Sequence, residues 1–141
     1  SFDMCATLAS DACKEGASVP GMGGFFAGYW WTFAYTQEHL TLDIPVLELI
    51  AFAANLIVFE RLLAPLAEAE STLLVAYIDA QASVQILSKD SAKSPVMQYV
   101  HGIIVDLPIF RRLQKCLAVS HLWGEANFAA DCASRHKLQR S

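Results

Sequence analysis

The longest apolar run in the chain, Ile44 to Phe59, does most to limit how this sequence can fold. It is interrupted by Pro45, Glu48 and Asn55 and ends at a charged pair, so it is too short and too polar for a membrane span, which takes about 20 apolar residues. Proline suits the first position of a helix, where its missing N–H costs nothing. We therefore expect a buried helix that begins at Pro45 and runs to about Leu63.

Three strand-like segments precede this helix. Residues 2–10 alternate in the period of a strand, which we expect to end at Asp11. A glycine-rich loop over 14–24 follows. The aromatic segment over 25–35 predicts two short antiparallel strands, with Gly28 at the turn or bulge between them.

After the helix, strand and helix alternate. Ser94 and Pro95 predict a helix N-cap followed by proline at the first helical position. That helix should break or kink near Pro108. The other elements we expect are a buried strand over 71–79, a short helix over 80–87, a second helical piece to Cys116, a last strand over 116–123 and a last helix over 125–134.

This order of elements defines a fold class. Three strands that can form an antiparallel meander, followed by strand–helix–strand crossovers, predict a single α/β domain over 1–141. Its five-stranded mixed sheet should have helices on both faces. Ligands of such sheets collect at the carboxyl ends of the parallel strands, and Asp11 and Asp79 each end a predicted strand.

Composition narrows the class of protein further. Of 141 residues, 55% are apolar and 17% charged, which excludes a disordered chain. The four cysteines show no zinc spacing and are expected to be free thiols in a reducing compartment. Residues 111–141 carry six of the ten bases but only two of the fourteen acids. This basic tail is either a solvated surface or a patch that contacts phosphates.

Four acids lie in apolar surroundings, where an unpaired charge is costly: Asp11, Glu48, Asp79 and Asp131. Each could be a cap or half of an ion pair, but only four bases occur in the first 110 residues. Converging carboxylates would instead suit Mg²⁺ or Mn²⁺, which prefer oxygen ligands. The residues alone leave both readings open.

Four stretches resemble the ribonuclease H family, in particular the RNase H domain that follows reverse transcriptase in retroelements. The stretches are SDACKEG…GMGGFF, IPVLELIAF, LLVAYIDAQAS and HLWGEANFAADCASR, and they extend over nearly the whole chain. The last is the most specific, since it resembles the retroelement pattern His-Ile-Pro-Gly-x-x-Asn-x-x-Ala-Asp-x-Leu-Ser-Arg. The resemblance implies that Asp11, Glu48, Asp79 and Asp131 bind two Mg²⁺ or Mn²⁺ ions, and that His121 is an accessory catalytic residue.

The sequence departs from the family pattern in several places. Ala80 follows the third acid, where relatives often have Asn or Ser, and Trp123 stands in place of Pro. Cys132 and Ala133 replace Ala-Leu, and the loop after Asp11 is longer than in compact relatives. None of these changes removes a carboxylate, so we expect a competent site.

The resemblance implies cleavage of the RNA strand of an RNA/DNA hybrid, with a covalently linked reverse transcriptase domain as partner and no membrane. The chain shows no secretion signal. We expect a segment of a longer intracellular protein, in the cytoplasm or the nucleus. The alternatives are a catalytically inactive RNase H-like scaffold domain, an integrase or transposase on the same fold, and a binding module. Glu48 argues against an integrase or transposase, and the net charge of −4 argues against a binding module.

Overall fold

The computed structural model describes residues 4–14, 19–69, 71–78 and 94–120. Within these ranges the elements are β1 (Met4–Cys13), β2 (Gly21–Phe26), β3 (Tyr29–Ala34), a 3-10 turn η1 (His39–Thr41), α1 (Ile44–Val58), α2 (Glu60–Glu68), β4 (Thr72–Ile78), α4 (Pro95–Asp106), α5 (Pro108–Leu113) and β5 (Leu117–Ser120). The predicted helices over 80–87 and 125–134 lie outside these ranges.

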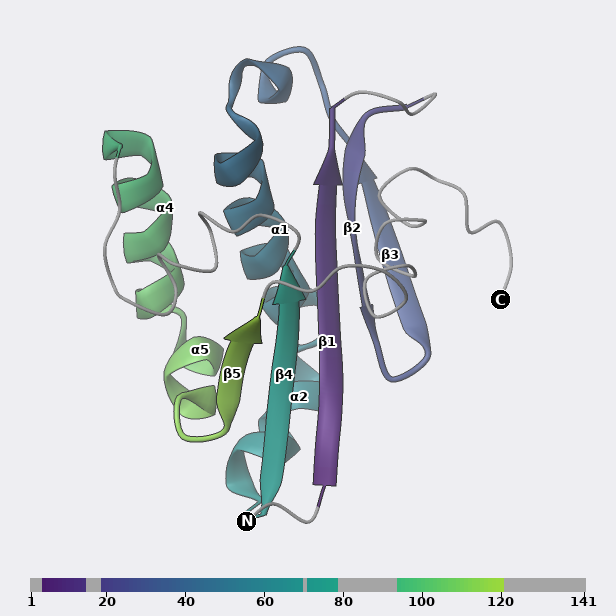
Figure 1. Ribbon diagram of the computed structural model, residues 1–141, viewed down its shortest axis with the longest axis vertical. Coiled ribbons are helices and arrows are strands. Elements are labelled where there is room, and N and C mark those ends of the chain that lie inside the picture. The colour runs from purple at the N-terminus through teal and green to yellow at the C-terminus, as the bar shows by residue number, and fades with distance from the viewer. Residues whose placement is uncertain (1–3, 15–18, 70, 79–93, 121–141) are drawn as a thin grey trace.

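The five strands form one mixed sheet in the order β3-β2-β1-β4-β5 (Figure 1). β1 is central, antiparallel to β2 and parallel to β4. β2 and β3 continue the meander, and β5 extends the parallel half. The predicted five-stranded mixed sheet, a meander followed by crossovers, is confirmed. Helices on both faces stay a prediction, because the described helices cover one face.

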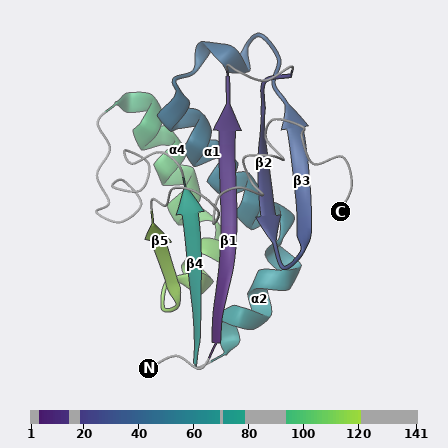
Figure 2. The same ribbon diagram turned by 45° about the vertical axis from the view of Figure 1, so that its right-hand side comes forward.

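The four described α-helices pack on one face of the sheet, which is turned away from the viewer in Figure 2. They share one hydrophobic core with alternate residues of the strands. On β4, for example, Leu74, Ala76 and Ile78 are buried on that face. Phe52 of α1 meets Phe110 of α5 edge to face, with ring centroids 6.1 Å apart. None of the helices in the described ranges has the length and apolarity needed to cross a bilayer.

The boundaries of the first two strands differ from expectation. β1 does not end at Asp11 but continues to Cys13. β2 begins at Gly21, inside the segment expected to be a loop. The turn at Gly28 is confirmed: Ala27 and Gly28 both have positive φ, 54° and 85°, as in the two-residue turns whose twist suits a hairpin.

The predicted helix to Leu63 is wrong, because the structure has two helices there. α1 ends at Val58, and Phe59 leaves the helical conformation with φ −100° and ψ 16°. Its ring is buried and lies 5.7 Å from that of Phe26. The change of direction brings Leu63 of α2 into the same core.

The serine and proline signals near α4 are confirmed. The Ser94 hydroxyl accepts a hydrogen bond of 3.1 Å from the Met97 N–H, and Pro95 occupies the first turn. α4 ends before Pro108, which begins α5. The second piece is shorter than expected, however, since α5 ends at Leu113 rather than Cys116.

Candidate active site

Asp11 lies near the carboxyl end of the central strand and is 4% exposed. The parallel ladder between β1 and β4 ends at the pair Ser10 and Ile78. Asp11 is therefore one residue beyond that ladder and faces Gly23 of β2 in the register. In sequence, Ile78 directly precedes the predicted ligand Asp79.

Glu48 lies in α1 and is 2% exposed. Its neighbour Leu47 packs in one cluster with Ala12 and Met22, so this part of α1 lies over the end of β1 and the start of β2. Two acids that are 37 positions apart (48 − 11) thus belong to segments in contact. Each is flanked in sequence by a residue of that shared cluster.

Tyr35 follows β3 and packs against the same cluster. Burial raises the pKa of Tyr35 well above its usual value, and the negative charges of Glu48 and Asp11 raise it further. Both carboxylates therefore lie within electrostatic reach of one phenol. Tyr35 could not be predicted as a site residue from the sequence, because it follows an aromatic strand and gives no polar signal of its own.

Asn55 joins α1 to the sheet through its side-chain amide. The amide nitrogen donates to the Ala9 carbonyl at 2.9 Å, and the amide oxygen accepts from the Trp31 indole N–H at 2.8 Å. The bridge thus ties α1 to β1 and β3, two turns after Glu48. Because Asn55 is fully buried, the bridge fixes where α1 lies along the sheet, and with it the position of Glu48.

Three of the five predicted site residues, Asp79, His121 and Asp131, lie outside the described residues. Within 4–14, 19–69, 71–78 and 94–120, no three His, Cys, Asp or Glu side chains gather closely enough to hold a metal ion. Asp11 and Glu48 nevertheless fit such an ion. Both are nearly buried oxygen donors, and a divalent cation offsets the cost of burying negative charge.

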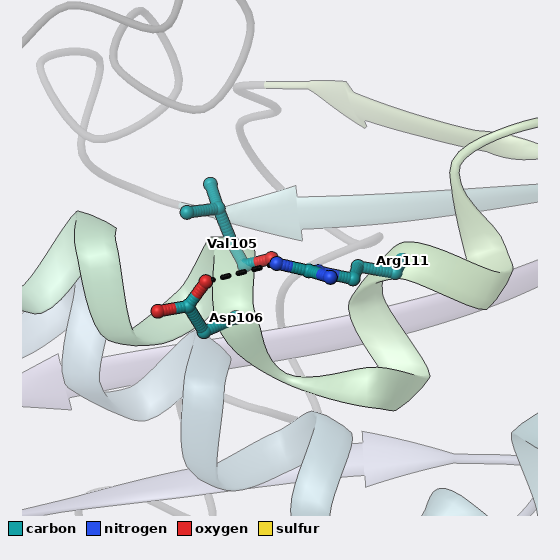
Figure 3. A network of polar contacts seen from close by, with 3 residues as sticks. All are labelled: Val105, Asp106 and Arg111. Carbon is teal, nitrogen blue, oxygen red and sulfur yellow. Dashed lines mark hydrogen bonds and ion pairs between the residues drawn. The ribbon is translucent and has the colours of Figure 1, made fainter.

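Two arginines of the basic tail make ion pairs on the surface. Arg111 donates to Asp106 and to the Val105 carbonyl, both at 3.0 Å, and so braces the junction of α4 and α5 (Figure 3). Arg112 contacts Glu68 at 2.9 Å. All four charged side chains are exposed, so these pairs stabilise the fold only slightly. They give both arginines a structural contact, and a role of the tail in phosphate binding stays a prediction.

Solved structures with the same arrangement of elements belong to ribonucleases H. LC11-RNase H1, isolated from compost by a metagenomic approach, gives a TM-score of 0.65 at 15% identity and covers 89% of each chain. The structure of LC11-RNase H1 in complex with an RNA/DNA hybrid gives a TM-score of 0.61. RNase H1 from the halophilic archaeon Halobacterium salinarum gives 0.64 at 13% identity over 95% of this chain and 97% of that one.

A viral protein contains the same fold within a longer chain. The protease–reverse transcriptase of prototype foamy virus gives a TM-score of 0.50 at 12% identity, over 97% of this chain and 21% of the viral one. No protein-family model and no curated sequence matches the chain. The class that the structure defines is therefore the RNase H-like fold.

Proposed function

We propose that this protein is a divalent-metal-dependent endonuclease that hydrolyses the RNA strand of RNA/DNA hybrids. It would act inside the cell as one domain of a retroelement reverse transcriptase. One observation carries the proposal: on an RNase H-like fold, buried Asp11 on the central strand and buried Glu48 on α1 belong to segments that pack together, because their sequence neighbours Ala12 and Leu47 share one cluster. Neighbouring buried carboxylates are the donors that metal-assisted phosphodiester hydrolysis needs.

The proposed chemistry divides between the bound cations and the chain. Asp11 and Glu48, with Asp79 and Asp131, would hold two Mg²⁺ or Mn²⁺ ions, which activate water and stabilise charge on the phosphate. The carboxylates would bind and position these ions, and His121 would carry a proton to or from the site. Backbone and 2′-hydroxyl contacts recognise a hybrid without reading its bases, so low sequence specificity is expected.

Two of the structural neighbours support the substrate and the setting. The compost enzyme is described in complex with an RNA/DNA hybrid. The foamy virus protein carries the fold in one chain with a protease and a reverse transcriptase. Together with the sequence resemblance to retroelement domains, they favour a hybrid nuclease linked to a polymerase.

The alternative is a catalytically inactive scaffold with the same fold. The departures from the family pattern at Ala80, Trp123 and Cys132 are what favour it. A cleavage assay separates the two functions. An active domain cuts the RNA strand of a hybrid with Mg²⁺ or Mn²⁺, stops with EDTA and leaves both strands of duplex DNA intact. A scaffold cuts none of these substrates.

Glu48→Gln tests the site itself. The amide keeps the size of the side chain but removes the charge that would bind the cation. We expect hybrid cleavage to fall by at least about 100-fold, which corresponds to about 2.7 kcal/mol of transition-state stabilisation. The measurement is the initial rate of RNA-strand cleavage at saturating Mg²⁺.

The matched control is Glu68→Gln. This glutamate is exposed and pairs only with Arg112 among the described side chains, so its loss should leave the rate within about twofold. Equal rates for Glu48→Gln and the unsubstituted protein would refute the assignment of Glu48.

A further inference from the structure

The Tyr35 hydroxyl is a buried donor that the described part of the fold does not use. Its oxygen is inaccessible to solvent, although the side chain as a whole is only partly buried. Within the described ranges it has no hydrogen-bond partner. A buried hydroxyl without a hydrogen-bond partner lowers the free energy of unfolding, so such a hydroxyl often has a functional role.

The fold holds this hydroxyl firmly in place. The Tyr35 N–H donates to the Pro20 carbonyl at 2.9 Å, which ties the residue to the start of β2. The ring contacts Phe33 and His39, with centroids 6.4 and 5.6 Å away. The side chain also packs against the cluster of Ala12, Met22, Leu47 and Ala51. Tyr35 is therefore held against residues of β1, β2 and α1.

Tyr35 is thereby close to the segments that carry the two carboxylates. Leu47 and Ala12, which share the cluster with Tyr35, are the sequence neighbours of Glu48 and Asp11. Burial is the largest cause of the raised pKa of Tyr35, and the negative charges of Glu48 and then Asp11 are the next largest. The phenol thus keeps its proton at neutral pH and can donate to an oxygen, with Glu48 as the acid that acts on it most.

We infer that Tyr35 is a positioning residue of the carboxylate site, whose hydroxyl donates a hydrogen bond to the Glu48 carboxylate in the metal-loaded protein. The inference rests on the proposed function and extends it to a residue that binds neither cation nor substrate. A carboxylate held by a donor loses less freedom when it binds a cation, because its orientation is already set. Tyr35 would therefore raise the affinity of the site for Mg²⁺.

Tyr35→Phe tests this inference, because it removes the hydroxyl and keeps the ring. Two measurements are made over a Mg²⁺ titration: the rate of hybrid cleavage and the melting temperature without substrate. We expect the Mg²⁺ midpoint of both curves to rise by about tenfold, the amount that loss of ordering contacts around a metal ligand brings. Without Mg²⁺ the variant should melt at the same temperature or higher, since it lacks a buried unpartnered hydroxyl.

Tyr99→Phe is the matched control. Tyr99 lies on α4 and is 72% exposed, so removal of its hydroxyl should leave both midpoints unchanged. Unchanged midpoints for Tyr35→Phe would overturn the inference. So would a lower melting temperature without Mg²⁺ at unchanged midpoints, because the hydroxyl would then be structural only.

The two measurements separate this inference from the proposed function. If the unsubstituted protein is stabilised by Mg²⁺ but cleaves no hybrid, the nuclease function fails, and the shifted melting midpoint still supports Tyr35. If the unsubstituted protein cleaves the hybrid and Tyr35→Phe has the same Mg²⁺ midpoints, the proposed function stands and the inference about Tyr35 fails. If Mg²⁺ neither stabilises nor activates the protein, both are overturned.

Discussion

The amide bridge of Asn55 explains why a glycine occupies the middle of β2. Gly24 pairs with Ser10 of β1 and with Trp31 of β3, so it lies under the bridge. A Cβ at Gly24 would overlap the Asn55 amide oxygen and the Trp31 indole nitrogen. Glycine in a strand often marks such a close approach. The polar Asn55 in an apolar run was visible in the sequence, but its partners were not, because they lie 24 and 46 positions away.

Gly24→Ala should therefore destabilise the protein. The added methyl must displace the fully buried Asn55 amide and the Trp31 indole that donates to it, and overpacking of this kind costs about 1–3 kcal/mol. Denaturant unfolding measures the loss. Gly102→Ala is the control, since a Cβ there meets nothing within 4 Å and the residue lies in α4. Alanine should stabilise that helix by about 0.5–1 kcal/mol. The same sign of change at both positions would contradict this account of Gly24.

At the scale of elements, the sequence predicted the helix ends that are set by a capping serine or by a proline. Ser94 caps α4, Pro108 separates α4 from α5, and Pro45 lies in the first turn of α1. The rules failed where tertiary contacts decide. The glycines over 14–24 predicted a loop, but the last of them belong to β2, which packs beneath the Asn55 bridge. The break at Phe59 was invisible because its cause is a core contact with Phe26.

Ser94→Ala tests whether the cap of α4 contributes as a local rule predicts. The substitution removes the acceptor of the Met97 N–H, and losses of this kind cost about 1 kcal/mol. We expect a loss of that size in the free energy of unfolding, while Ser94→Asp, which also caps, should change it little. A loss as large in Ser94→Asp would show that the hydroxyl acts through some contact other than the cap.

At the scale of the molecule, the order of elements was enough to predict the sheet, whereas the site was only partly predictable. Asp11 and Glu48 were singled out by their apolar surroundings, and the resemblance implied their role as metal ligands. The structure brings their segments together. Tyr35 could not be found, because only the packing of the folded chain brings it against Ala12 and Leu47, the residues next to Asp11 and Glu48. The assignments of Asp79, His121 and Asp131 stay predictions, since these residues lie outside the described ranges.

Metal binding at the site should appear as stability of the whole protein. A ligand that binds only the folded state stabilises it, by about 2.7 kcal/mol when present at 100 times its dissociation constant. We expect Mg²⁺ to raise the melting temperature and EDTA to reverse the rise. In Asp11→Asn, which lacks one charged ligand, the rise should shrink sharply. NaCl at matched ionic strength is the control, because screening alone acts on any charged surface.

Without Mg²⁺, Asp11→Asn should not lower the melting temperature. Crowded carboxylates repel one another, so replacing one by a neutral amide removes an unfavourable term. Asp11→Asn should then melt no lower than the unsubstituted protein in EDTA. If instead it melts far lower in EDTA and both proteins gain equally from Mg²⁺, Asp11 holds the fold together and binds no cation. That result would leave an RNase H-like domain whose central acid is structural, which is what the scaffold alternative requires.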